Sequence, residues 1–68
     1  MYASRESNLS RRERQVLDQI QLGLTNRQIA TRLFVSTNTV NKHVRQVLRK
    51  LAVGNRVQAA MLGQRIAT

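Results

Sequence analysis

Apolar residues recur at spacings of three and four along most of this chain, which is the period of a helix that buries one face. The pattern predicts four helices joined by short connections. Their expected ranges are Ser10–Leu22, Thr25–Leu33, Ser36–Leu51 and Asn55–Ile66. We therefore expect an all-α fold, a compact four-helix domain.

The predicted helix starts carry capping residues. A capping box places a Ser, Thr or Asn three residues before a Glu or Gln, so that each side chain bonds the backbone N–H of the other. The sequence contains this spacing at Ser10 and Glu13, at Thr25 and Gln28, and at Asn55 and Gln58. Ser36 is a fourth candidate N-cap without the box. The caps and the apolar periodicity agree on the same four helices.

The third predicted helix has two chemically different faces. Its apolar stripe consists of Val40, Val44, Val47, Leu48 and Leu51. Its polar face carries Asn38, Asn41, Lys42, Arg45 and Arg49. Only Phe34 and Val35 separate the second helix from the Ser36 cap, so the two helices must meet at a steep angle around a short turn. This is a central helix-turn-helix, whose basic face could enter a DNA major groove about 12 Å wide.

Charge indicates what such a face would bind. The 68 residues include 12 Lys and Arg against 3 Asp and Glu, for a formal net charge of +9. All three acids lie at or before Asp18, which leaves eight basic residues after it with no acidic counterpart in that stretch. We expect their partner to be an external polyanion. The hydrophobic fraction of 41% argues for a packed core instead of disorder.

Composition also excludes several classes of protein. With no Cys and a single His, neither a disulfide framework nor a zinc site is expected, and no cofactor or metal is predicted. No apolar run approaches the roughly 18 residues of a membrane span. Nothing at the N-terminus resembles an export signal, so a cytoplasmic location is expected, with association with the nucleoid when bound to DNA. The lone His43 lacks a pocket and a tuned partner, so catalysis is not expected.

Several ordered motifs resemble the LuxR-type helix-turn-helix domain, a family that includes effector domains of NarL and FixJ response regulators. They are Leu9–Leu17 (LSRRERQVL), Thr25–Ala30 (TNRQIA), Val35–Ser36, Thr39–Val40, His43, Lys50–Leu51, Asn55–Arg56 and Ala59. The resemblance implies a bacterial transcription regulator whose domain spans residues 9–68. Residues 1–8 would then form a flexible lead-in or the end of a linker.

The resemblance also implies roles for individual residues. Positions that match Asn41, Lys42 and Arg45 commonly face base edges in the family. Asn41 departs from the family, which usually has Lys there, and an Asn can pair with adenine N6 and N7. Gln28 is a second departure, because the family usually carries Glu at this position.

Phosphate contacts are expected around the helix N-termini on the same surface, where backbone N–H groups and the helix dipole favour anions. The candidates at these N-termini are Asn26, Arg27, Ser36, Thr37 and Thr39, and Arg49 on the polar face of the third helix is a further candidate. For Ser36, plain helix capping is at least as good an explanation.

Two further residues leave alternatives open. Many turns of this type place Gly where Phe34 stands, because the turn needs a positive φ. Either the turn has another geometry or Phe34 is an aromatic core anchor that tolerates strain, and we favour the core anchor. For Arg56, beside the Asn55 cap, a structural role stands beside a functional one: its guanidinium would bond carbonyls at the end of the third helix.

The fourth predicted helix has apolar residues on two sides. The resemblance implies that one side mediates a homodimer, and the chosen residues are Val57, Ala60, Met61 and Gln64. The alternative is that both sides pack within the monomer. A DNA-bound dimer would place two recognition helices on half-sites about one helical turn apart.

Sequence-specific binding of double-stranded DNA is therefore the leading hypothesis. The alternative is a helix-turn-helix module that acts mainly through RNA polymerase contacts. A membrane-surface element and an RNA-binding module are disfavoured, because only 3% of the residues are aromatic. The sequence leaves open whether this is a stand-alone regulator or the C-terminal domain of a longer one. It also leaves open the operator, the regulated genes, the signal, and activation or repression.

Overall fold

A computed structural model describes the backbone of residues 8–67 and the side chains of residues 8–62. The described chain contains four helices and no strand, as the periodicity predicts. They are α2 (Arg11–Gln21), α3 (Asn26–Leu33), α4 (Thr37–Leu51) and α5 (Arg56–Ala67). The predicted lead-in lies outside the described residues, apart from Asn8 in a turn before α2.

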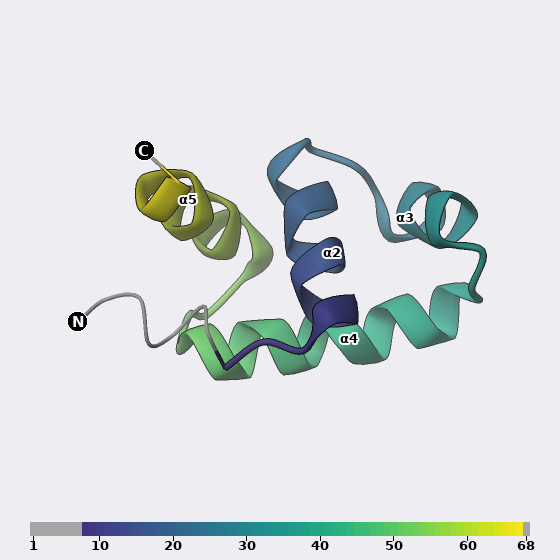
Figure 1. The fold of residues 1–68 in the computed structure, drawn as a ribbon, viewed down its shortest axis with the longest axis horizontal. Helices are drawn as coiled ribbons and strands as arrows, with labels where there is room; N and C mark the ends of the chain where they lie inside the picture. The colour runs from purple at the N-terminus through teal and green to yellow at the C-terminus, as the bar shows by residue number, and fades with distance from the viewer. Residues whose placement is uncertain (1–7, 68) are drawn as a thin grey trace.

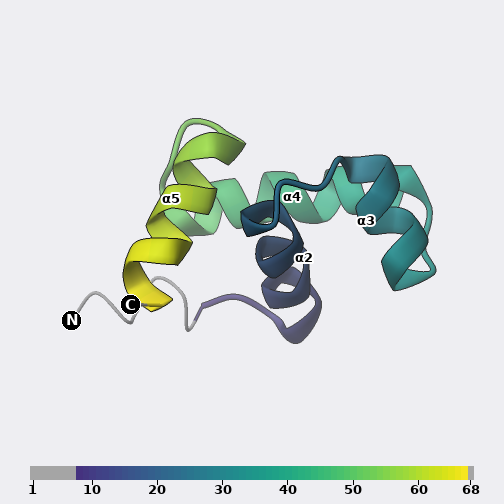
Figure 2. The same ribbon diagram turned by 90° about the horizontal axis from the view of Figure 1, so that it is seen from above.

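Helix α4 is the base of the fold. It has 15 residues and is about 22 Å long at 1.5 Å per residue. Helices α2, α3 and α5 all lie on one side of it, with α2 between the other two (Figures 1 and 2). The opposite side of α4 is therefore not covered by any described helix.

The core consists of two apolar clusters that meet at α2 and α4. One lies between α2, α3 and α4 and contains Val16, Ile20, Ile29, Ala30, Val40 and Val44. The other lies between α2, α4 and α5 and contains Leu17, Val47, Leu51 and Ala59. Leu48, on the same stripe of α4, packs against both clusters. The predicted apolar stripe of the third helix is thus confirmed as the surface onto which the other helices pack.

The N-caps follow the prediction with one exception. Ser10 with Glu13 and Thr25 with Gln28 each form both bonds of a capping box. Asn55 accepts a bond from the Gln58 N–H, but Gln58 Oε1 accepts from the N–H of Gly54 instead of Asn55. The third box is therefore displaced by one residue along the chain.

Helices α3 and α4 each end in a left-handed residue. At the end of α3, the N–H of Phe34 bonds the carbonyl of Thr31 and the N–H of Val35 bonds that of Ala30. This is the Schellman arrangement, which needs a residue with positive φ after the helix. Phe34 adopts it, with φ 59° and ψ 43°. The turn therefore has the geometry that usually calls for Gly.

The prediction that Phe34 is a core anchor is wrong. Its side chain is 94% exposed, whereas the next residue, Val35, packs against the core. The left-handed residue reverses the chain direction, so the residue after it is the one that returns to the helix surface. Ala52 repeats this arrangement at the end of α4, with φ 58°.

Candidate nucleic-acid interface

The uncovered side of α4 carries the polar face that the sequence predicts. Val40, Val44, Val47 and Leu51 are buried against the other helices. Asn38, Lys42, Arg45 and Arg49 are exposed, and Asn41 is half-buried. Three cations and the amide of Asn38 therefore lie along one helix on the side that no other described helix covers, and Asn41 lies at the edge of that side next to α3. Such a surface suits the phosphates and base edges of a DNA groove.

The start of α4 is capped from within the chain. Ser36 Oγ accepts a hydrogen bond from the Thr39 N–H at 3.1 Å and lies 2.9 Å from Thr39 Oγ1. The capping role of Ser36 is thus present, and its phosphate contact stays a prediction. Thr37 is exposed on the first turn of α4, and Arg27 is exposed on the first turn of α3. The phosphate contacts of Thr37 and Arg27 stay predictions.

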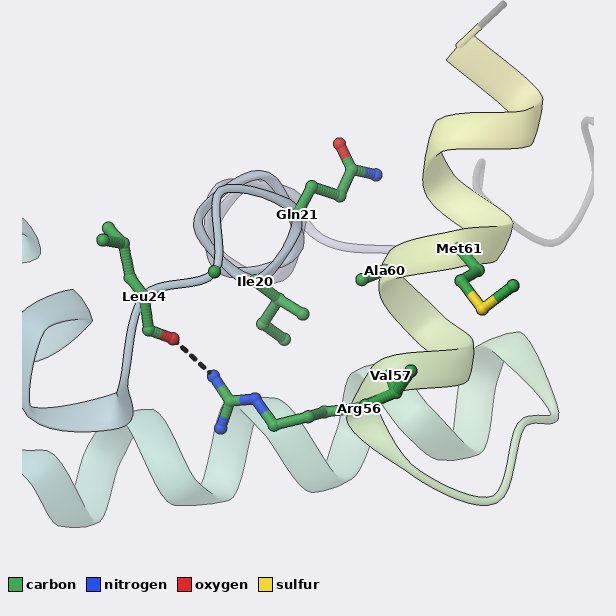
Figure 3. A pocket seen from close by; sticks show the side chains of 8 residues that line it. Ile20, Gln21, Leu24, Arg56, Val57, Ala60 and Met61 are labelled. Atoms are coloured by element: carbon green, nitrogen blue, oxygen red, sulfur yellow. Dashed lines mark hydrogen bonds between the residues drawn. The ribbon is translucent and has the colours of Figure 1, made fainter.

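Arg56 connects α5 to the helix-turn-helix. Its Nη2 donates to the backbone carbonyl of Leu24 at 2.9 Å (Figure 3), and its Nη1 donates to Asn26 Oδ1 at 2.6 Å. The structural role predicted for Arg56 is confirmed, but the predicted partner is wrong. The carbonyl belongs to the loop between α2 and α3 instead of the end of α4, because α5 packs against α2 and brings its first turn beside that loop.

A further hydrogen bond links Asn26 to Asn41, one of the residues that are expected to face base edges. Asn26 Nδ2 donates to Asn41 Oδ1, so that the two predicted contact residues are partners of each other. Neither bond could be anticipated from the sequence, because the partners lie 15 and 30 residues apart. The sequence-based expectation that Asn41 pairs with adenine is not tested by this bond, but such pairing would require Asn41 to release Asn26.

Not every cation after Asp18 needs an external partner. Lys50 Nζ lies 2.7 Å from Oε1 of Glu13, which is buried at 4% exposure. Burial raises the pKa of Glu13, but the hydrogen bonds from Lys50 and Ser10 and the charge of Lys50 outweigh it and lower the pKa below its ordinary value. The expectation of an external polyanion is therefore wrong for Lys50. An external polyanionic partner stays a prediction for the exposed cations Arg27, Arg32, Lys42, Arg45 and Arg49.

Helix α5 exposes part of the predicted dimer surface. Val57 is 64% and Met61 57% exposed, whereas Ala60 packs against the first core cluster. These three residues line one side of a shallow hollow of about 340 Å³, with Ile20, Gln21 and Leu24 on its other side (Figure 3). Gln64 belongs to α5, but its side chain lies outside the described residues.

The lone His and the acidic residues are the candidates for catalysis or metal binding in the sequence. His43 is half-buried on α4, and its Nδ1 is buried without a hydrogen-bond partner. Among the described residues, no three His, Cys, Asp or Glu side chains gather where they could hold a metal ion. Within the same part of the chain, no helix is long and apolar enough to cross a membrane.

Known proteins that are similar to this chain include bacterial response regulators and a transcriptional regulatory protein. A nitrate/nitrite response regulator protein homolog of Haemophilus influenzae is 53% identical over 55 residues, which are 81% of this chain and 26% of that protein. A probable csgAB operon transcriptional regulatory protein of Salmonella typhimurium is 44% identical over 59 residues, 85% of this chain and 27% of that protein. The nitrate/nitrite response regulator protein NarP of Escherichia coli is 48% identical over 56 residues, 82% of this chain and 26% of that protein.

The chain thus spans about a quarter of the length of these relatives. Residues 7–62 match the family of bacterial regulatory proteins described as the luxR family. This match covers α2, α3 and α4 completely and the first half of α5. Such regulators act by binding DNA and are not enzymes, in keeping with the basic face of α4. The chain belongs to the luxR family of bacterial regulatory proteins, and its four helices form the helix-turn-helix domain of a transcription regulator.

Proposed function

We propose that this domain binds specific sequences of double-stranded DNA with α4 in the major groove. The observation that carries the proposal is the uncovered basic side of α4, since α2, α3 and α5 all pack on its other side. A helix of about 22 Å with three exposed cations fits a groove about 12 Å wide. Binding to chromosomal DNA would place the protein in the bacterial cytoplasm, on the nucleoid.

The proposed contacts divide into two kinds. Asn41, Lys42 and Arg45 face base edges, because they occupy the polar side of α4 near its N-terminal half. The phosphate contacts come from both helices of the helix-turn-helix and are Asn26, Arg27, Ser36, Thr37, Thr39 and Arg49. The Asn26 side chain already bonds Arg56 and Asn41, so it would reach a phosphate only through the second N–H of its amide group. The exposed Arg27 and Arg49 supply the positive charge of this set.

We also propose that the domain dimerises through α5 on paired half-sites. Val57 and Met61 are large apolar side chains exposed on the same helix face, where they border the hollow beside α2. The proposed interface comprises Val57, Ala60, Met61 and Gln64. Because Ala60 already packs partly within the monomer, Val57 and Met61 would supply most of the newly buried apolar area.

The test of DNA binding is the salt dependence of affinity for a duplex selected from a random pool. If each protomer neutralises about three or four phosphates, a dimer releases counterions from about six to eight, which gives a log–log slope of about −5 to −7. A monomer would give about half that slope. A slope near zero would refute the electrostatic argument. It would favour the alternative in which the module acts through RNA polymerase.

The test of dimerisation compares duplexes that carry one or two half-sites. Met61→Glu places a charge on the proposed interface and should weaken binding to paired half-sites by about tenfold or more, since the second site is then no longer bound intramolecularly. Binding to a single half-site should fall only slightly through the added negative charge. Gln15→Glu, an exposed change on α2, is the matched control. Equal losses for the two variants would refute the α5 interface.

A further inference from the structure

Three side chains from three helices form one chain of hydrogen bonds that ends on the recognition helix. Arg56, the first residue of α5, donates to the carbonyl of Leu24 at 2.9 Å (Figure 3) and to Asn26 Oδ1 at 2.6 Å. Asn26, the first residue of α3, donates through Nδ2 to Asn41 Oδ1 in α4. Both Asn side chains are half-buried, which restricts their alternative contacts with water.

The chemistry of arginine fixes the orientation of both amides. A guanidinium group has only donors, so the atom of Asn26 that faces Arg56 must be its oxygen. The nitrogen of Asn26 then faces Asn41, and the atom of Asn41 that receives it must also be an oxygen. Asn41 is left with its NH₂ group for other partners. The two orientations of an amide have nearly the same shape, so this network decides between them.

We propose that Arg56 and Asn26 are positioning residues that make Asn41 a pure hydrogen-bond donor toward DNA, so that it selects guanine at its base pair. This proposal rests on the proposed entry of α4 into the major groove. Guanine presents two acceptors there, O6 and N7, whereas cytosine presents the N4 donor. Adenine pairs best with an Asn that presents both its nitrogen and its oxygen in the groove, whereas the oxygen of Asn41 is directed at Asn26.

A single substitution inverts the polarity of this network. In Asn26→Asp, both side-chain oxygens are acceptors, so Arg56 keeps its partner while Asn41 must turn its NH₂ toward residue 26. The oxygen of Asn41 then faces the groove and accepts from adenine N6 or cytosine N4. We expect preference at one base pair to shift from guanine toward adenine or cytosine by about tenfold, with the other base pairs unchanged. The measurement is the affinity for the selected duplex and for its single-base variants.

Two controls separate this effect from simple charge repulsion. Asn38→Asp adds the same charge to an exposed position of α4 without touching the network, and it should lower affinity for all duplexes alike. In an Asn41→Ala background, Asn26→Asp should leave the base preference unchanged. If Asn26→Asp does not fold, Asn26→Ala tests the same point, since it frees the oxygen of Asn41 and should make adenine acceptable at that base pair.

The outcomes distinguish the two proposals. If the wild-type domain selects no duplex sequence, the proposed function fails. If it selects a sequence but Asn26→Asp and Asn26→Ala both keep its base preferences, the positioning role of Asn26 is overturned. Selection of adenine at the Asn41 base pair by the wild-type domain would overturn it as well.

Discussion

The pair formed by Glu13 and Lys50 gives the sharpest stability prediction, because one substitution removes its charge and little else. Glu13→Gln keeps a side-chain oxygen that can accept from the Ser10 N–H, as Gln28 does for Thr25 in the same molecule. What is lost is the carboxylate that lies 2.7 Å from Lys50 Nζ. The substitution therefore isolates the ionic contact between the start of α2 and the end of α4.

The burial of the two groups sets the magnitude. Removing one partner of a fully buried pair costs about 3 to 5 kcal/mol, whereas an exposed pair contributes about 0 to 1 kcal/mol. The Glu13 side chain is 5% exposed, but that of Lys50 is 34% exposed and can recover water when its partner is lost. We therefore expect Glu13→Gln to lower the free energy of unfolding by about 1 to 2 kcal/mol at pH 7. In a domain of this size, such a loss lowers the Tm by about 4 to 8 °C for each kcal/mol.

The assay is urea unfolding of both proteins from pH 7 to pH 2.5. Because folding lowers the pKa of Glu13 below its ordinary value of 4.5, its contribution is fully present above that value and is lost as the pH falls through the folded-state pKa. The difference between wild type and variant should therefore close at low pH. Asp18→Asn, which removes an exposed pair with an N···O distance of 3.7 Å, should cost at most about 0.5 kcal/mol. The reasoning is refuted if the two variants cost the same at pH 7, or if the Glu13→Gln deficit does not shrink as the pH falls.

Three further predictions concern the turn and the basic face. Phe34→Gly should stabilise the domain by about 0.5 to 1 kcal/mol in urea unfolding, since it relieves a left-handed backbone without exposing new apolar area; a loss of stability would contradict the strain. Lys42→Ala and Arg45→Ala should each cost about 1 to 3 kcal/mol on the selected duplex and relax base preference, whereas equal losses on random duplex would make α4 only an electrostatic clamp. Arg49→Ala should reduce the salt slope of DNA binding by about 1. Lys50→Met, at the neighbouring position, should leave the slope unchanged because Lys50 is paired with Glu13.

The sequence predicts the helices well because their determinants are local. Apolar spacing and caps act within four residues, and the predicted ranges agree with the observed helices to within one residue at each end. The buried stripe of α4 follows from the same periodicity. The capping box at Asn55 is displaced because the Gln58 side chain can bond either of two adjacent backbone N–H groups. Residue spacing alone does not predict which of the two it bonds.

The prediction that Phe34 enters the core is wrong because the apolar character of a residue does not specify its side-chain direction. An aromatic residue between two amphipathic helices suggests burial, yet the Schellman turn requires a left-handed residue directly after α3. The backbone hydrogen bonds from Phe34 and Val35 offset the cost of that conformation, and Val35 supplies the apolar contact. The geometry of the turn therefore decides which of two adjacent apolar residues enters the core.

The network around Asn26 lies beyond local patterns for another reason. It depends on how α5 packs against α2, which brings Arg56 to a loop 32 residues earlier in the chain. No spacing rule relates Arg56, Asn26 and Asn41, although each residue type is compatible with a polar contact. A predicted site can thus have the right residues and still miss the contacts that orient them.

Charge illustrates the same distinction between composition and placement. The net charge of +9 indicates an anionic partner, but the structure divides the cations by role. Lys50 neutralises Glu13, and Arg56 is directed toward Leu24 and Asn26. The cations of the helix-turn-helix that remain exposed are Arg27 and Arg32 on α3 and Lys42, Arg45 and Arg49 on α4. A single ion pair on the surface contributes little free energy in water. Five exposed cations on two adjacent helices therefore gain the most binding free energy from a partner that presents many phosphates at once. The packing that buries the apolar stripe of α4 therefore also places the cations of α4 together on the side that no described helix covers, where the proposed DNA contact lies.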